Sequence, residues 1–137
     1  MGATWSAPIR VNDDLGEFDQ FFPDIAVNRA GSVQVFWYDR RNSVENLAMD
    51  IYGAQMAPGG QSFQANTRLT SVMFRPAVGY DPLTNRIYMG DYNDIKVMQG
   101  PTGPALDFLS AWGDFRRQIT TLGGRRRDQD VMFKRLQ

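Results

Sequence analysis

Two stretches of this sequence share one pattern, and this repeat restricts the fold more than any other feature. The segment SVQVFWYDRR at 32–41 matches DFLSAWGDFRR at 107–117, and the match aligns Trp37 with Trp112. Around each stretch, short apolar runs alternate with Gly, Pro, Asn and Asp, which is typical of β-strands joined by turns. A repeated unit of short antiparallel strands predicts an all-β architecture built from similar sheets.

The first unit contains four strand-like runs and spans residues 21–70. Strands are expected at 21–27, 32–39, 49–56 and 63–70. Turn-forming residues separate them, including NRAG after the first run and APGGQ after the third. Sequential short strands with short turns predict an up-and-down antiparallel sheet. No segment shows the period of a long helix.

The second unit spans residues 88–136 and contains only three such runs. Strands are expected at 91–98, 107–117 and 129–136, with longer loops between them. The segment QITTLGGRRRD in this unit is expected to be a loop, and GGRRRDQD at 123–130 is interpreted as a solvated basic patch rather than a nucleic-acid site.

One strand-like run has no sheet of its own. WSAPIRVN at 5–12 repeats the pattern of FQANTRLT at 63–70, the fourth run of the first unit. We therefore interpret 5–12 as an orphan outer strand. An unpaired strand edge promotes aggregation, and propellers remove such edges by closing a ring. The orphan is expected to complete a three-stranded sheet of another copy or of missing sequence.

The first unit resembles a blade of the sialidase-like β-propellers, also known for their BNR or Asp-box repeats. In that family a strand ending in W-x-D-x-R precedes a D-[IV]-Y strand and an "Asp box" turn, S-x-D-x-G-x-[TS]-[WF]. Here the box is partial, because Gly60, Ser62 and Phe63 fit while Pro58 occupies the aspartate position. The stretch from 81 to 136 is similar to the final blade of such proteins.

The resemblance implies two propeller blades per chain. Family propellers usually have six blades, so it also implies self-association, as three copies around one axis. The alternative is that the chain is the end of a larger propeller. For function, the resemblance favours a non-catalytic module for assembly and recognition that binds carbohydrate at the channel mouth. A glycoside hydrolase of the sialidase type, or a fragment of one, is the alternative, and a scaffold without ligand is a third reading.

Composition excludes several classes of function. Lys and Arg number 15, as do Asp and Glu, so the formal net charge is zero. No global field therefore favours nucleic acid or anionic membrane, and no apolar run is long enough to span a bilayer. The chain has no Cys and no His, which removes thiolate and imidazole chemistry. We expect no cofactor and no metal, and the compartment stays open.

Charged residues lie at equivalent strand ends of the two units, Asp39, Arg40 and Arg41 in the first and Asp114, Arg116 and Arg117 in the second. Of these, Asp39, Arg41, Asp114 and Arg117 are the candidate ligand contacts. Arginine and aspartate near a channel mouth suit an acidic sugar or an array of hydroxyls. The alternative is that they pair with each other and brace loops. The bracing role is favoured, because a single site would not need both copies. Similarly, we expect Trp37 and Trp112 to pack in a core rather than to stack on sugar.

The loop YMGDYND supplies two more candidates, Asp91 and Tyr92, at the start of an inner strand that would line the channel. Its oxygen ligands suit calcium, but the spacing lacks a twelve-residue calcium loop. A turn in which Asp91 caps backbone amides is favoured.

Sialidase chemistry, as the resemblance implies it, needs an arginine triad, a tyrosine activated by glutamate and an aspartic acid. FRPA at 74–77 resembles the family's F-R-I-P motif without its isoleucine. Only Glu17 and Glu45 are available as the glutamate. No pair of carboxylates is marked for hydrolysis, so a catalytic role is not the preferred interpretation.

Overall fold

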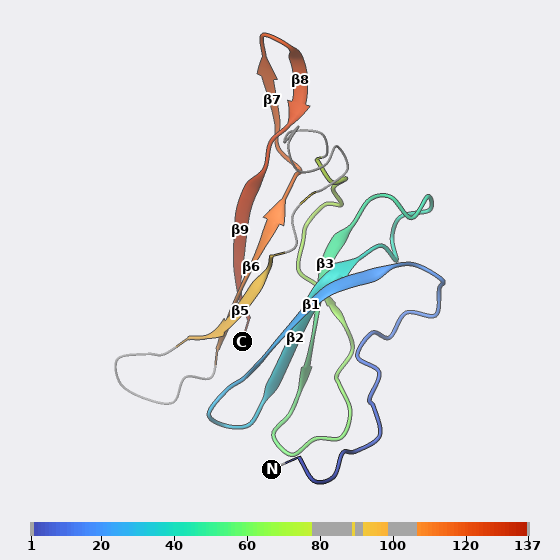
Figure 1. The fold of residues 1–137 in the computed structure, drawn as a ribbon, viewed down its shortest axis with the longest axis vertical. Helices are drawn as coiled ribbons and strands as arrows, with labels where there is room; N and C mark the ends of the chain where they lie inside the picture. The colour runs from blue at the N-terminus through green and yellow to red at the C-terminus, as the bar shows by residue number, and fades with distance from the viewer. Residues whose placement is uncertain (1, 78–88, 90–91, 99–106, 137) are drawn as a thin grey trace.

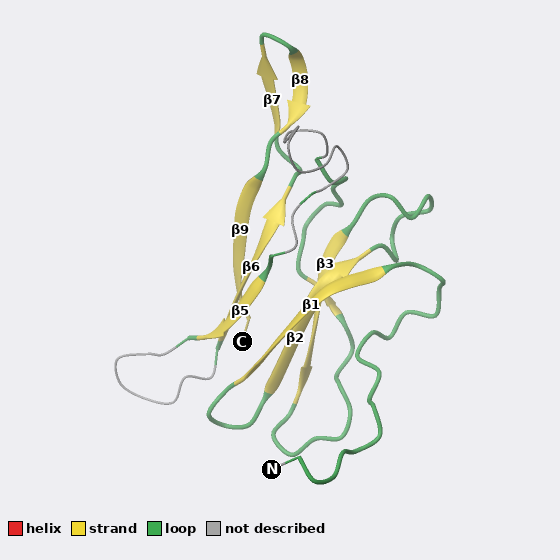
Figure 2. Ribbon diagram, in the orientation of Figure 1, coloured by secondary structure: helices red, strands yellow, loops and turns green. Residues whose placement is uncertain are grey.

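The computed structural model describes residues 2–77, 89, 92–98 and 107–136. These residues form antiparallel sheets of two to four strands and no helix (Figures 1 and 2). The all-β prediction is confirmed for this part of the chain. In the same residues, no helical segment offers the length and apolar character needed to cross a membrane.

The first sheet has four strands in sequential order. They are β1 (Gln20–Val27), β2 (Val33–Asp39), β3 (Asp50–Met56) and β4 (Thr67–Arg68). The first three agree with the predicted runs to within a residue, but β4 is much shorter than the expected 63–70. Isolated backbone hydrogen bonds flank it, from Gln64 to Gln55 and from Leu69 to Ile51. The ladder is interrupted at Asn66, whose backbone amide donates to the Asp13 carboxylate and whose side chain donates to the Val11 carbonyl oxygen.

Local turn chemistry produces the predicted turns of this sheet. The Asn28 side-chain oxygen accepts hydrogen bonds from the amides of Ala30 and Ser32, both at 3.0 Å, and closes the β1–β2 turn. After β3, the Gly60 amide donates to the Ala57 carbonyl oxygen at 2.9 Å, and Gly59 adopts a φ of 67°. This left-handed conformation favours glycine.

The second sheet has three strands in the order β5, β6, β9. They are β5 (Asp94–Val97), β6 (Phe108–Asp114) and β9 (Asp130–Leu136). Each lies within a predicted run. The prediction of a loop between β6 and β9 is wrong, because this segment forms a hairpin of β7 (Gln118–Thr121) and β8 (Gly124–Arg127). β-branched residues favour the strand β7, and Gly124, with a φ of 107°, permits the tight turn. The hairpin projects beyond the sheet in Figure 1.

The two sheets pack face to face over one apolar core. Its buried members come from both sheets and from the segment after β4, and include Phe36, Tyr38, Ile51, Leu69, Phe74, Ile95, Phe108, Trp112 and Phe115. Trp37 lies in a smaller cluster on the opposite face of the first sheet, with Val35 and Tyr52. The predicted core positions of the tryptophans are confirmed, since Trp37 and Trp112 are 3% and 4% exposed.

The strands β1 and β5 lie next to each other where the sheets meet. The Asp24 carboxylate accepts a hydrogen bond of 2.8 Å from the Ile95 amide, and the Asn93 side chain donates to the Phe22 carbonyl oxygen. The β1–β2 register shifts between Phe21 and Asp24, and Phe22 has a φ of 51°. This bulge turns the Asp24 carboxylate toward the second sheet.

Residues 5–12 form no strand within the described chain, so the strand predicted there is absent from the isolated copy. The segment runs along the outside of the molecule, and the Trp5 side chain is 90% exposed. Only its end is attached, because the Val11 carbonyl oxygen accepts a hydrogen bond from Asn66. Its pairing with a sheet of another molecule stays a prediction.

Candidate functional site

Asp39 and Arg41 form a buried ion pair at the end of β2. The Asp39 side-chain oxygen Oδ2 accepts hydrogen bonds from the Arg41 guanidinium at 2.8 Å and 3.0 Å and from the Trp37 indole at 2.7 Å. Its other oxygen accepts the Arg41 amide at 2.8 Å. The guanidinium also lies over the Tyr52 ring, 4.2 Å from the centroid. The Asp39 carboxylate is therefore saturated by the chain itself.

The second sheet repeats this arrangement at the end of β6. The Asp114 carboxylate accepts two hydrogen bonds from the Arg116 guanidinium, at 2.8 Å and 2.5 Å, one from its amide at 3.0 Å and one from the Trp112 indole at 3.2 Å. We name these two groups the Trp–Asp–Arg braces. They support the bracing role favoured from the sequence.

The brace of the second sheet uses one of two adjacent arginines. Arg116, not Arg117, pairs with Asp114. The Arg117 side chain is 62% exposed and lies 3.6 Å from the carboxylates of Asp128 and Asp130. Arg116 follows Asp114 by two residues, as Arg41 follows Asp39. The W-x-D-x-R pattern therefore aligns Arg116, and not Arg117, with Arg41.

The braces hold their groups in the charged state. Burial alone would raise the pKa of Asp114, but hydrogen bonds from Arg116 and Trp112 lower it below its ordinary value of 3.8. Burial alone would likewise lower the pKa of Arg41, and hydrogen bonds to Asp39 and Asp13 raise it. The two arginines remain cationic, and their charge is neutralised within the brace.

A third buried carboxylate, Asp50 at the start of β3, joins three segments of the first sheet. One of its oxygens accepts hydrogen bonds from Arg68 and Thr70 at 2.7 Å each, and the other accepts the Asn42 amide group at 2.9 Å. Arg68 is the last residue of β4, and Thr70 lies two residues after it. This network fixes the outer strand on β3.

The predicted loop site is described only in part. Asp91 lies outside the described residues. Tyr92 is 90% exposed and borders a shallow hollow with Trp112, Gly113 and Val131. Among the described residues, no group of three or more acidic side chains is arranged to hold a metal ion.

The motif FRPA places Arg75 on the surface. Its guanidinium forms an ion pair of 2.5 Å with Glu45, and both side chains are more than half exposed. Glu45 is one of the two glutamates considered for sialidase chemistry. Asp39 and Asp114 are paired with other arginines, Arg41 and Arg116.

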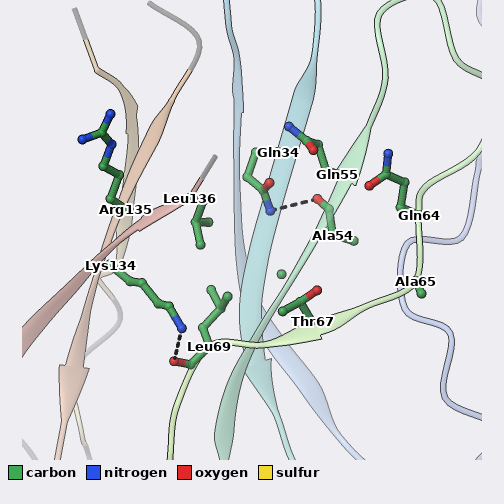
Figure 3. A pocket seen from close by; sticks show the side chains of 11 residues that line it. Gln34, Ala54, Gln55, Gln64, Ala65, Thr67, Leu69, Lys134, Arg135 and Leu136 are labelled. Atoms are coloured by element: carbon green, nitrogen blue, oxygen red, sulfur yellow. Dashed lines mark hydrogen bonds between the residues drawn. The ribbon is translucent and has the colours of Figure 1, made fainter.

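A cleft lies between the two sheets (Figure 3). Its volume is about 460 Å³. Figure 3 shows the side chains of Lys134, Arg135 and Leu136 from β9 on one side, and those of the first sheet on the other. The Lys134 ammonium group bridges the sheets by donating to the Leu69 carbonyl oxygen at 3.1 Å.

The lining combines polar groups with apolar surface. Gln55, Gln64 and Thr67 face the cleft, and the structure shows no hydrogen bond to these side chains from the described residues. Gln34 differs, because its amide nitrogen is held by the carbonyl oxygens of Val35 and Ala54. Amides, a hydroxyl and nearby cations can bind a neutral or anionic polyhydroxyl ligand.

Sequence reasoning missed this cleft. Its residues come from β2, β3, β4 and β9, and no motif marks them. Only the packing of two distant sheets brings them together. The available signal was a glutamine in each of two predicted strands of the first unit, Gln55 and Gln64.

Comparison with known proteins gives no match: no protein-family model, curated protein or solved structure is significantly similar to this chain.

Proposed function

We propose that this chain is a non-catalytic, sialidase-like β-propeller module that acts in assembly and in glycan recognition. In this proposal the two sheets are successive blades, and glycan binds in the cleft between them. The proposal moves the ligand away from the braced residues predicted from the sequence, because those side chains already bind one another.

The repeated Trp–Asp–Arg brace is the observation that carries the blade assignment. It occurs at the same end of the second strand in both sheets, with the same donors and acceptors. The packing agrees with this reading, because the sheets meet face to face and their first strands, β1 and β5, lie side by side. Radial repetition of antiparallel sheets is the defining property of propellers.

The cleft supports glycan recognition. Its unpaired amides at Gln55 and Gln64 and the Thr67 hydroxyl can bind ring hydroxyl groups, while Leu69 and Leu136 offer apolar surface to the C–H groups of a sugar. Lys134 places positive charge at one wall, which favours glycans that carry a carboxylate, whereas the Arg135 guanidinium is paired with Asp107.

The buried acids support a non-catalytic role. A general acid or nucleophile must contact the substrate. Asp39, Asp50 and Asp114 are each at most 1% exposed and are held by arginine, tryptophan or threonine donors. They stabilise the sheets and do not face the cleft lining.

A glycan array probed with purified protein tests recognition, with sialylated and neutral glycans as ligands. We expect binding to at least one glycan class, with a loss of about tenfold or more in affinity for the Gln55→Ala/Gln64→Ala variant. Gln118→Ala is the matched control, since it removes an exposed glutamine of β7 outside the cleft. Absence of binding, or binding indifferent to the cleft variant, contradicts the cleft as the glycan site.

A second measurement addresses the enzymatic alternative. Incubation with a fluorogenic sialoside and other aryl glycosides is expected to give no turnover above the buffer blank. Turnover that persists through purification and depends on Arg75 or Glu45 would favour the glycoside hydrolase instead.

A further inference from the structure

We infer that residues 5–12 of one copy add to the free edge of β9 in a second copy, and that copies joined in this way close into a ring. The inference rests on the proposed propeller arrangement and names the partner that completes it. Four observations on the described residues carry it.

The first observation is the free edge of β9. In the described chain, β9 pairs with β6 along its full length and with no strand on its other side. Val131 is 81% exposed and Phe133 is 75% exposed. The corresponding strand of the first sheet is β3, which has β4 on its outer side, and its Ile51 is buried in the core between the two sheets. An exposed apolar edge is a site for strand addition.

The second observation is a carboxylate that lacks its strand partner. Asp50 and Asp130 occupy the same position, opposite the brace aspartate of their own sheet. Asp50 binds Arg68 and Thr70, which belong to β4 and the residues after it. Asp130 has no such strand beside it, and the Arg117 guanidinium approaches only to 3.6 Å.

The third observation is that residues 5–12 carry the missing groups. Alignment with 63–70 places Arg10 on Arg68, Val11 on Leu69 and Asn12 on Thr70. The Arg10 side chain is 61% exposed, and it contacts Asn12 and Asp14, which lie within four residues of it. Arg10 can therefore take the place of Arg68 on the Asp130 carboxylate, whereas the Asn12 amide already donates to Asp14 and Gln20.

The fourth observation is the way this segment meets the first sheet. The Arg41 guanidinium donates to the Asp13 carboxylate at 2.6 Å, as the Arg116 guanidinium donates to the Ser71 hydroxyl at 3.1 Å. Asp13 follows the orphan segment by one residue, and Ser71 follows 63–70 by one residue.

The apolar contacts repeat in the same way. Val11 packs on the cluster that contains Trp37, and Leu69 belongs to the core that contains Trp112. Residues 11–13 thus approach the first sheet as residues 69–71 approach the second. Residues 69–71 follow directly after β4, the outer strand of the first sheet, and contact the second sheet. By analogy, residues 11–13 contact the first sheet and are positioned to follow an outer strand that belongs to a neighbouring sheet.

The chain's own β9 cannot be that sheet. Val11 and Asp13 lie against the Trp37 face of the first sheet, whereas the second sheet packs on the opposite face. Figure 1 shows the amino-terminal segment and β9 on opposite sides of the first sheet. The β9 edge that receives the segment must therefore belong to another molecule.

The exposed faces of the two sheets complement each other in such an assembly. The Trp37 face carries a mainly apolar hollow of about 180 Å³, lined by Val11, Phe21 and Val35 among others. The outer face of the second sheet offers Val131 and Phe133 as apolar side chains to pack against it. Tyr92 lies beside them at the position of Phe22, which packs between the sheets inside one chain.

The internal repeat fixes the expected register. Thr67 lies opposite Gly53, and Arg68 lies opposite Tyr52. By the same alignment, Ile9 of one copy lies opposite Phe133 of the next. Propellers typically contain about four to eight blades, so two blades per chain correspond to about two to four copies in the ring.

Disulfide trapping tests the pairing directly, since the chain has no cysteine of its own. We expect the Ile9→Cys/Phe133→Cys variant to form disulfides between copies under mild oxidation, because directly opposed strand residues satisfy disulfide geometry. A non-reducing gel then shows covalent products that end at one size. The control is Ile9→Cys/Leu122→Cys, which places the second thiol at the exposed hairpin tip and is expected to stay monomeric on the gel.

A charge exchange tests the ion pair. Arg10→Asp is expected to raise the concentration needed for half-assembly about tenfold or more, and Arg10→Asp/Asp130→Arg to restore it. Rescue excludes misfolding as the cause. No disulfide, a disulfide within one chain, or no rescue would overturn the inference.

The outcome is separable from that of the glycan test. A monomer that binds glycan in the cleft overturns the ring and leaves recognition intact. A ring that binds no glycan supports the ring and contradicts only the recognition proposal.

Discussion

The Tyr38 hydroxyl lies 3.1 Å from the Gly113 amide nitrogen and 3.0 Å from the Gly113 carbonyl oxygen, so one side chain of the first sheet occupies both backbone hydrogen-bonding groups of a residue in the second. Tyr38 also stacks on Phe21 within the apolar core, with ring centroids 5.4 Å apart. This contact joins the two sheets at a point where neither sheet continues the other's ladder.

Replacing Tyr38 with phenylalanine is expected to destabilise the protein. The ring keeps its packing, but the Gly113 amide and carbonyl lose their partner inside the molecule, at a cost of about 1–3 kcal/mol in the free energy of unfolding. Urea denaturation followed by tryptophan fluorescence measures this change. Tyr92→Phe is the matched control, because the Tyr92 side chain is 90% exposed, and it should shift stability by less than about 0.5 kcal/mol. Equal effects of the two substitutions would contradict the bridging role of Tyr38.

The same hydroxyl predicts a loss of stability in alkali. Burial raises the pKa of Tyr38 from 10.0 to about 12. Between these values the unfolded chain releases the tyrosine proton while the folded chain retains it, so the unfolded state gains stability relative to the folded state as the pH rises. The contribution is present in full below pH 10 and disappears as the pH rises through 12. Unfolding titrations at pH 9 and pH 11.5 should therefore show a larger drop for the wild type than for Tyr38→Phe. A parallel drop in the two proteins would argue against a raised Tyr38 pKa.

The two adjacent arginines after β6 should differ sharply in their contribution. Arg116→Ala leaves the fully buried Asp114 carboxylate without its ion-pair partner, which costs about 3–5 kcal/mol. Arg117→Ala removes an exposed side chain that lies 3.6 Å from its acidic neighbours, and should cost less than about 1 kcal/mol. Thermal or urea unfolding of both variants separates these expectations. A larger effect at Arg117 would show that the brace is assigned to the wrong residue.

Sequence reasoning located the strands because their apolar residues and turns are local signals. The strands β1 and β3 end at Val27 and Met56, directly before the turns that were predicted at Asn28 and around Gly59. It missed the hairpin of β7 and β8, since its strands carry exposed threonine and arginine with no buried face to give alternation. The strand at 63–70 was predicted, but its length was wrong, because Asn66 bonds residues 11–13, a contact between distant segments.

The candidate sites divide in the same way. The braces repeat in sequence and their bracing role was predictable, although the sequence did not show which of Arg116 and Arg117 pairs with Asp114. The cleft depended on how β9 packs beside β3 and β4, which no local pattern encodes. The role of Lys134 could not be predicted for the same reason, because its ammonium group reaches the Leu69 carbonyl oxygen only when the two sheets pack together.

Native mass spectrometry of the wild-type protein at micromolar concentration tests the central claim most directly, namely that the two sheets are blades of a ring completed by further copies. The chain mass is 15.5 kDa, so the number of chains in the particle is read without ambiguity. The account predicts a single dominant species of about two to four chains, with no larger series, because a closed ring leaves no free edge. A monomer at this concentration, or an open ladder of ever larger species, would contradict it.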